Sequence, residues 1–329
     1  MPPSTLPASI AERSRLRGAN AHAAPPLAER LGAWELVELV AEGAFSRVYR
    51  ARAGAGDAAR PPAYAVKRLK PELADDCVAI QLLRREARVG SAIHHPRLAP
   101  ILAANVERPP YYLVMPWLSG STLEAIISRQ SSDDRPQNAR NGRRPVALQP
   151  ILAPLSLIHS LWFTRQIAEA LAALDAAGWT HSDVKPANVM VSPDGHATLI
   201  DLGLARRPAD EDHSIDRAQV GTPNYMAPEL FVSMVRPDIR SDIYSLGVLL
   251  FELLTGKTTH QAEPSRAGAI PRRLTAFDLR DLPRAAPPGV AQLVQQMLAG
   301  EPLRRPQKPA EVVDALTALE IEFFADGIE

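Results

Sequence analysis

The sequence predicts an α+β fold in which a small β-rich region with one helix precedes a larger and mainly helical region. The prediction depends on where two kinds of apolar periodicity occur along the chain. Short segments that alternate like strands are confined to the first third, and longer segments with helical spacing dominate the remainder. A length of 329 residues fits one large two-lobed domain or two smaller domains.

The β-rich region is predicted from short alternating or apolar segments rich in valine, leucine, tyrosine and alanine. A helix is expected between the third and fourth of them, at about 75–93, where Val78, Leu82 and Val89 are set among charged residues. The predicted strands cover residues 34–40, 47–51, 63–69 and 111–115.

The remainder is predicted to be mainly helical. Residues 161–177 have helical periodicity and are followed by Gly178, a residue that commonly ends helices. The almost wholly apolar run at 243–254 predicts a buried central helix. Two further amphipathic helices are expected at 290–298 and 309–324.

Two stretches lack periodicity. Residues 1–31 are rich in proline, alanine and arginine, and we expect a mostly disordered tail there. Residues 129–154 are polar and then punctuated by proline, which predicts an insertion on the surface. The folded domain is therefore expected to span residues 32–325.

Composition excludes several classes of function. Lys and Arg number 37, as do Asp and Glu, so no net charge favours nucleic acid or an anionic membrane. Cys77 is the one cysteine, which excludes an intramolecular disulfide and indicates a reducing compartment. No apolar run approaches the roughly 20 residues that span a bilayer, and the first residues lack a secretion signal. We therefore expect a cytoplasmic protein that binds neither nucleic acid nor membrane.

The most specific motif lies between residues 181 and 203. It reads H-S-D-V-K-P-A-N, which contains Asp183, Lys185 and Asn188, and D-L-G follows at Asp201 after a short apolar run. Phosphoryl transfer requires an acid–base group for a hydroxyl proton, a cation for a phosphate and oxygen donors for a divalent metal. A single Asp or Asn in a loop is usually a turn former, but this set in this order is very improbable by chance.

The segment resembles the catalytic loop and metal loop of eukaryotic-type (Hanks-type) serine/threonine protein kinases. The resemblance covers about residues 34–324, and the alanine- and arginine-rich composition indicates a bacterial member. It implies a bilobal protein-kinase-like fold with an N-lobe at about 32–115 and a C-lobe at about 117–325. It also implies ATP with Mg²⁺ or Mn²⁺ as cofactors, and protein substrates with Ser or Thr hydroxyls, including the chain itself through autophosphorylation.

The same resemblance assigns roles within the motif. Asp183 would orient and deprotonate the substrate hydroxyl, and Lys185 would neutralise the γ-phosphate as its charge develops. Asn188 and Asp201 would hold the metal ion. His181 is expected to be structural.

By resemblance, the first third would bind the nucleotide. Residues 40–48 occupy the place of the glycine-rich loop but keep only Gly43 of its three glycines, and a plain hairpin is the alternative. Lys67 would contact the α- and β-phosphates and pair with Glu86; the alternative is an exposed lysine and a surface glutamate. Met115 would lie beside the adenine, whose edge would bond the Pro116 carbonyl and the Leu118 backbone. The expected nucleotide-binding residues are Ala41, Gly43, Val48, Ala65, Lys67, Glu86, Met115, Pro116 and Leu118.

Supporting residues are also implied by resemblance. Thr222 would bridge Asp183 and Lys185, and Asp242 would brace the catalytic loop from the buried helix. Glu229, at the end of an A-P-E segment, would pair with Arg305.

The chain departs from the family pattern at two informative positions. Ser182 replaces the arginine that normally grips a phosphate on the activation loop. We therefore expect that loop phosphorylation, at Ser214 or Thr222, is not a strict on-switch. Gly90, one helical turn after Glu86, removes a side chain that usually packs against the apolar residue of the metal loop, here Leu202, so we expect the helix that carries Glu86 to be mobile.

Two alternatives to an active protein kinase stay open. A nucleotide-binding pseudokinase that acts as a scaffold would explain the missing glycines and arginine, although pseudokinases commonly lose at least one of the four polar residues kept here. A small-molecule kinase of related fold is the other alternative, and the A-P-E segment argues for a protein substrate instead. The four residues are Lys67, Asp183, Asn188 and Asp201.

Overall fold

The computed structural model divides into two compact units. Residues 29–54, 61–92 and 100–118 form the first unit, and the other described residues form the second. The predicted order, a β-rich unit followed by a mainly helical one, is confirmed. The structure describes residues 29–54, 61–131, 155–207, 222–232, 237–257, 278–283 and 286–326.

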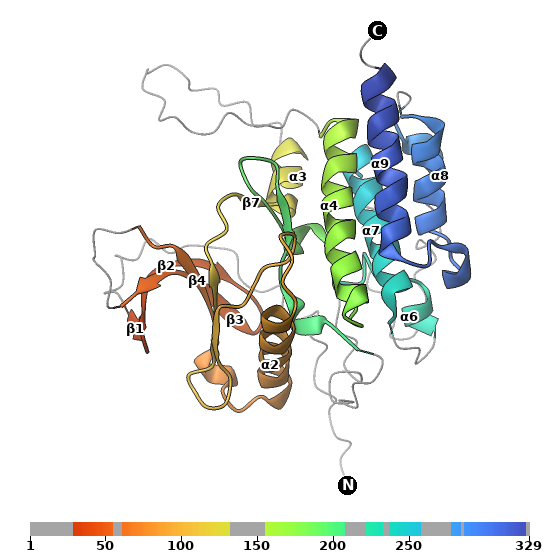
Figure 1. Cartoon of the computed structure of the whole chain (residues 1–329). Coiled ribbons are helices and arrows are strands. Elements are labelled where there is room, and N and C mark those ends of the chain that lie inside the picture. The colour runs from red at the N-terminus through yellow and green to blue at the C-terminus, as the bar shows by residue number, and fades with distance from the viewer. Residues whose placement is uncertain are drawn as a thin grey trace, which may run out of the picture. The chain divides into compact units, whose positions relative to one another are not determined.

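The strands described in the first unit form one antiparallel sheet in the order β1-β2-β3-β4-β6-β5 (Figure 1). The four predicted strands correspond to β2, β3, β4 and β6, whereas β1 and β5 have three residues each and are too short to show alternation. β1 includes the last residues of the expected tail, so regular structure begins earlier than predicted. The bounds are β1 (Glu29–Leu31), β2 (Trp34–Glu42), β3 (Ser46–Ala53), β4 (Tyr64–Leu69), β5 (Ala103–Asn105) and β6 (Tyr112–Pro116).

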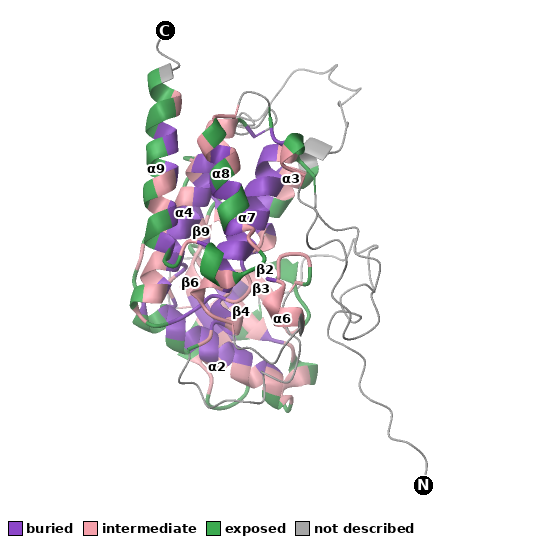
Figure 2. Ribbon diagram, turned by 90° about the vertical axis from the view of Figure 1, so that its right-hand side faces the viewer, coloured by how far each residue is buried: buried purple, intermediate pink, exposed green. Residues whose placement is uncertain are grey.

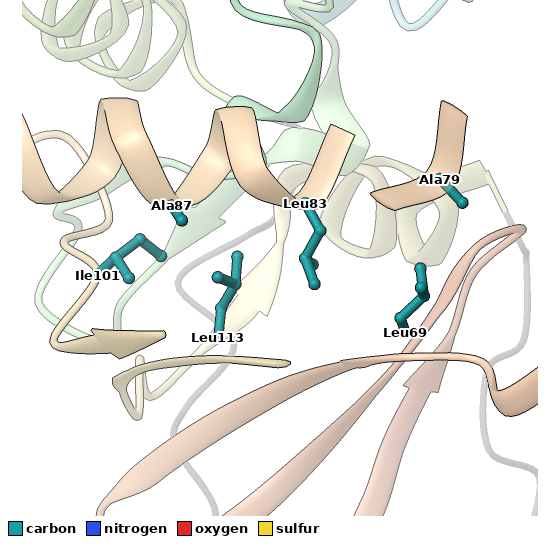
Figure 3. Close-up of a cluster of buried hydrophobic side chains, with 6 residues drawn as sticks. All are labelled: Leu69, Ala79, Leu83, Ala87, Ile101 and Leu113. Carbon is teal, nitrogen blue, oxygen red and sulfur yellow. The ribbon is translucent and has the colours of Figure 1, made fainter. Parts of the chain in front are cut away.

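The helix α2 (Cys77–Ala92) packs its apolar face on this sheet. It follows the short 3-10 helix η1 (Pro71–Leu73), and Asp76 Oδ1 caps it by accepting the backbone N–H of Ala79 at 3.0 Å. Apolar side chains four residues apart point from α2 toward the strands, as a helix with one buried face requires (Figure 3). The cluster consists of Leu69, Ala79, Leu83, Ala87, Ile101 and Leu113.

The helix α7 forms the core of the second unit. Every residue from Ser241 to Leu254 is buried, as the apolar run predicted. Asp238 caps its start by accepting the N–H of Arg240, and Gly256 ends it with a φ of 65° that favours glycine. The helix α4 packs against α7 and α9, and α8 also packs against both α7 and α9 (Figure 1). The bounds are α3 (Leu123–Ser131), α4 (Leu157–Ala176), α6 (Glu229–Val232), α7 (Ile239–Thr255), α8 (Pro288–Met297) and α9 (Pro309–Asp326).

The helix α9 is amphipathic, as its sequence predicted. Its buried residues include Val312, Leu316 and Leu319, and the opposite side is exposed along the helix (Figure 2). The spacing of three and four residues explains why one stripe alone is covered.

A small sheet places the motif residues of the second unit. It consists of β7 (Ser121–Thr122), β8 (Val189–Val191) and β9 (Ala197–Leu199), with the 3-10 helices η2 (Pro186–Asn188) before β8 and η3 (Leu202–Leu204) after β9. The antiparallel register pairs Val189 with Leu199, and the N–H of Ile200 donates to the carbonyl of Asn188 at 2.9 Å. Asn188 and Asp201 therefore lie at the same end of the β8–β9 hairpin.

Some predictions fall on residues outside those described. They include Ser214 and the insertion from residue 132 onward, whereas residues 129–131 belong to α3. Among the helices that the structure describes, none combines the length and the apolar character needed to cross a bilayer.

Candidate functional site

Asp183 is the centre of a hydrogen-bonded cluster in the second unit. Asn188 Nδ2 donates to Asp183 Oδ2 at 2.8 Å and to the Asp183 carbonyl at 2.9 Å. Lys185 Nζ lies 2.6 Å from Asp183 Oδ2. Both carboxylate oxygens are engaged, because Thr222 Oγ1 donates to Oδ1 at 3.2 Å.

Thr222 lies between Asp183 and Lys185, as the sequence predicted. Its hydroxyl accepts a hydrogen bond from Lys185 Nζ at 2.8 Å while it donates to Asp183. The Thr222 hydroxyl therefore orients both the Asp183 carboxylate and the Lys185 ammonium group. The arrangement holds a carboxylate in a single orientation, as a general base requires.

Asp242 braces the backbone that leads to Asp183. Its Oδ2 accepts the N–H of His181 at 2.6 Å, and its Oδ1 accepts the N–H of Ser182 at 2.8 Å. Burial of this carboxyl raises its pKa to about 7, against the opposing effect of the two N–H groups. The brace predicted for Asp242 is confirmed by these contacts.

The ring of His181 is fully buried, and both of its nitrogens contact backbone groups. Nε2 lies 3.3 Å from the carbonyl of Ile200, and Nδ1 accepts the N–H of Asp183 at 3.3 Å. Burial lowers the pKa of His181, although the nearby charges of Asp183 and Asp201 act to raise it. A neutral ring with both nitrogens on backbone groups agrees with the structural role expected for His181.

Asn188 and Asp201 offer hard oxygen donors at the end of the β8–β9 hairpin. Both hydrogen bonds of the Asn188 side chain use Nδ2, so Oδ1 is the atom that could bind a metal. Asp201 has a φ of 66°, which is uncommon for a residue with a side chain. In the described part of the chain, no group of three or more His, Cys, Asp or Glu side chains could hold a metal. Two oxygen donors fit Mg²⁺, which is commonly held by one or two side chains and completed by phosphates and water.

In the first unit, the strand register brings five expected nucleotide-binding residues to one face of the sheet. Ala41 pairs with Val48, Val48 pairs with Lys67, and Ala65 pairs with Met115. Directly paired residues share a face, and residues two apart on a strand do so as well. All five side chains therefore lie on the face that α2 covers.

The other expected nucleotide-binding residues lie at strand ends. Gly43 is in the β2–β3 turn, where its N–H donates to the Ser46 carbonyl at 2.8 Å. Pro116 ends β6 on the opposite face from Met115, and Leu118 follows the strand. The neighbouring Trp117 is fixed, because its N–H donates to the Ala63 carbonyl at 2.9 Å.

Lys67 and Glu86 form the expected ion pair. Lys67 Nζ lies 2.6 Å from Glu86 Oε2, and the Glu86 side chain is 5% exposed. A buried carboxylate is stable only when it is paired and hydrogen-bonded. The alternative of an exposed lysine and a surface glutamate is therefore wrong.

Ile101 packs closely against Gly90 of α2. A Cβ at Gly90 would lie 2.5 Å from Cγ1 of Ile101, and the Ile101 N–H donates to the Gly90 carbonyl at 3.1 Å. Gly90 therefore permits a close approach of Ile101 to α2. The side chain that packs there comes from a different segment of the chain, and the mobility expected for this helix stays a prediction.

Glu229 and Arg305 form the predicted ion pair. Arg305 donates from Nη1 to Oε1 at 2.8 Å and from Nη2 to Oε2 at 2.7 Å, and its side chain is 0% exposed. Its remaining donors bond carbonyls of Arg240 and Ala299, and its guanidinium lies over the Tyr244 ring. A buried arginine with this many partners ties α6 to the segment before α9.

One polar contact near the site was not predicted. Tyr225 Oη donates to Glu252 Oε2 at 2.6 Å, and Ser245 Oγ donates to the Tyr225 carbonyl at 2.7 Å. Burial raises the pKa of Glu252 above its ordinary value. Glu252 is the one charged residue in the apolar run at 243–254, and that isolation is a signal that could have identified it.

Comparisons with known proteins agree with this geometry. The family model described as protein kinase domain matches residues 34–318. The chain is similar to the serine/threonine-protein kinase PknD of Mycobacterium tuberculosis, with 29% identity over 309 residues that cover 91% of this chain and 42% of PknD. PknE of the same species is 33% identical over 234 residues, which cover 71% of this chain and 37% of PknE.

PknA of Mycobacterium tuberculosis is 29% identical over 300 residues, which cover 88% of this chain and 61% of PknA. The chain thus spans less than two thirds of the length of each of these relatives.

Proposed function

Because the chain belongs to the protein kinase family, we propose that it transfers the γ-phosphate of ATP to serine or threonine hydroxyls of protein substrates. The observation that carries the proposal is the cluster of Asp183, Lys185, Asn188 and Thr222. It combines an oriented carboxylate, a cation and an amide oxygen within one compact unit. The bilobal fold and the family are the context in which these groups acquire their roles.

Asp183 is the proposed base. It would orient the substrate hydroxyl and accept its proton as the oxygen attacks. The hydrogen bonds from Thr222 and Asn188 keep the carboxylate in one orientation. Lys185, 2.6 Å from Asp183, would offset the negative charge that develops on the transferred group.

The nucleotide would be held by residues of the first unit. Bound ATP with Mg²⁺ supplies the phosphoryl group and neutralises part of its charge. Lys67, fixed by Glu86, would provide a cation to the phosphates, and Pro116 and Leu118 would offer backbone groups to the adenine. Asn188 and Asp201 would ligate the metal through their side-chain oxygens. Mn²⁺ takes similar ligands and is an alternative metal.

The protein would also phosphorylate itself. Autophosphorylation requires a hydroxyl of one molecule to reach Asp183 of the same or another molecule. We also propose that its protein substrates are cytoplasmic, in accord with the reducing compartment that the single cysteine, Cys77, indicates.

Transfer from radiolabelled Mg-ATP to the protein itself and to a generic protein substrate tests the proposal. We expect Asp183→Asn to lower the rate by about 10²–10⁴-fold, the range for a general base. Asp194→Asn makes the same chemical change at an exposed residue of the β8–β9 turn and is the matched control. Acid hydrolysis of the product should release phosphoserine or phosphothreonine.

Two outcomes would contradict the proposal. Equal labelling by wild type and Asp183→Asn would show that the cluster does not perform the transfer. Thermal stabilisation by nucleotide without any transfer would instead support the nucleotide-binding scaffold.

A further inference from the structure

The turn between β2 and β3 is tied to the end of β4. Lys70, the first residue after β4, donates its backbone N–H to the Phe45 carbonyl at 2.9 Å. The Phe45 ring packs against the apolar cluster of Figure 3. The turn itself is closed by the hydrogen bond from Gly43 to Ser46. Its tip is therefore fixed to the sheet as well as to the two strands that it joins.

The Lys70 side chain adds an ionic contact across the turn. Its Nζ lies 2.9 Å from Glu42 Oε1, and Arg47 Nη2 lies 3.4 Å from the same oxygen. Arg47 also lies 3.7 Å from Glu72. The four side chains alternate in charge in the order Lys70, Glu42, Arg47 and Glu72. A single exposed ion pair contributes little to stability, but a network of several charges contributes more.

The turn also has fewer backbone conformations than a glycine-rich one. Ala41 and Ser46 occupy two positions at which the family pattern has glycine. Glycine reaches conformations that alanine and serine do not. With fewer accessible conformations, contacts of modest strength suffice to select one.

The ion pair of Lys70 with Glu42 also affects the charge beside the turn. Glu42 is the last residue of β2, next to the turn that the proposed function places over the phosphates, and it lies on the sheet face opposite to Ala41. Hydrogen bonds from Lys70 and Arg47 lower the pKa of Glu42, so the carboxylate keeps its charge. Charge acts across the thin loop, so an uncompensated carboxylate beside it would disfavour a triphosphate on the other face, and the two cations offset that charge.

We propose that Lys70 is a positioning residue for the nucleotide, because it both fixes the β2–β3 turn and neutralises Glu42. The inference rests on the proposed function, since it takes this turn to be the loop that covers the phosphates. Loss of Lys70 frees the turn and leaves the Glu42 charge beside it offset by Arg47 alone. Loss of Glu42 frees the turn and removes that charge, so the two changes differ in their effect on nucleotide binding.

The test compares Lys70→Met, Glu42→Gln and the double variant with wild type in the full chain. Amide hydrogen exchange at Gly43 and Lys70 reports the turn, and release of a fluorescent N-methylanthraniloyl-ATP reports nucleotide binding. Glu29→Gln is the matched control, because it breaks another ion pair of the same sheet, with Arg68 at 2.6 Å.

We expect Lys70→Met and Glu42→Gln each to speed amide exchange by about two- to fivefold, the equivalent of losing exposed ion pairs. Nucleotide release should be faster in Lys70→Met than in Glu42→Gln, and the double variant should behave like Glu42→Gln. Added salt should speed exchange in wild type and have little effect on the double variant. Glu29→Gln should leave both measurements unchanged.

The outcomes separate this inference from the proposed function. Amide exchange as slow in Lys70→Met as in wild type would show that Lys70 does not fix the turn. Nucleotide release as slow as in wild type would show that Lys70 does not position the nucleotide. Failure of wild type to bind the nucleotide would overturn the proposed function, and the role of Lys70 toward phosphates with it. Normal wild-type binding with an unaffected Lys70→Met variant would overturn the inference alone.

Discussion

Ser182 donates its backbone N–H to Asp242 Oδ1 at 2.8 Å, while its own backbone has a φ of 66°. A residue with a side chain in a sparsely populated backbone conformation carries a strain of about 1–3 kcal/mol, which surrounding contacts must outweigh. Asp242 supplies such a contact from the buried helix α7. The backbone that immediately precedes Asp183 therefore depends on a carboxylate 60 residues later in the sequence.

Asp242→Asn should weaken this brace without changing the size of the side chain. The amide has one accepting oxygen and presents an NH₂ group to the second N–H, which leaves a buried donor unsatisfied. Such a loss costs about 1–3 kcal/mol, and we expect a lower Tm together with slower phosphate transfer. Asp194→Asn, at an exposed turn, should change neither. A variant with wild-type Tm and rate would show that the brace is dispensable.

The raised pKa of Asp242 predicts a dependence of stability on pH. The pKa is about 7 in the folded protein against an ordinary value of 3.8, so the folded state binds the proton more tightly between these values. The contribution of Asp242 to the free energy of unfolding is thus full below about pH 4 and is lost as the pH rises through 7.

Urea unfolding of wild type and Asp242→Asn from pH 5 to 8.5 measures this effect. The stability of wild type relative to the variant should fall as the pH rises. His181, whose pKa is lowered, acts in the opposite direction below about pH 6.5 but is present in both proteins. A difference that is constant with pH would contradict the prediction.

Arg305→Met should destabilise the second unit strongly. The substitution removes the bidentate ion pair of the Arg305 guanidinium with the Glu229 carboxylate. The hydrogen bond from the Ser241 hydroxyl to Glu229, at 3.0 Å, is kept. Breaking a buried ion pair by removing one partner costs about 3–5 kcal/mol. Arg304→Met is the control, because the neighbouring Arg304 is exposed and pairs with Glu301 on the surface. That variant should lose about 0–1 kcal/mol, and equal losses in the two variants would refute the argument.

Gly90→Ala should destabilise the first unit through overpacking. The new methyl group would lie 2.5 Å from Ile101, which requires α2 or Ile101 to move. Overpacking of this kind costs about 1–3 kcal/mol and should also weaken the Lys67–Glu86 pair carried by the same helix. Gly300→Ala is the control, since nothing lies within 4 Å of its added carbon. Full stability of Gly90→Ala in thermal unfolding would contradict this reading of Gly90.

The cluster around Asp183 could be predicted because most of its residues lie within one short segment and their order is informative. Asp183, Lys185 and Asn188 required no knowledge of tertiary contacts. The long helices were predictable for a similar reason, since their periodicity extends over several turns. Their bounds shifted by a few residues, because caps such as Asp238 lie outside the periodic run.

What the sequence did not predict depends on contacts between distant segments or on very short elements. Gly90 looked like a missing side chain because Ile101, which fills the space, belongs to another part of the chain. The contact of Lys70 with Glu42 joins two charged residues that only the pairing of β2, β3 and β4 brings together. β1 and β5 are three residues long, and alternation cannot be recognised in so few positions.

Phosphatase treatment should leave the protein active. Ser182 carries a hydroxyl that bonds Thr180 at 3.0 Å, in place of the guanidinium that would grip a phosphate on the activation loop. Without that arginine, a phosphate on the activation loop lacks the partner through which it would order the loop. Phosphorylation of Thr222 should instead inhibit, because its hydroxyl already bridges Asp183 and Lys185 and a phosphate there would repel the Asp183 carboxylate.

The measurement compares phosphate transfer before and after treatment, with phosphate content followed by mass spectrometry. Thr222→Ser should retain most activity and Thr222→Glu should lose it. An inactive dephosphorylated protein that recovers only on loop phosphorylation would show that another cation has taken over the role of the missing arginine.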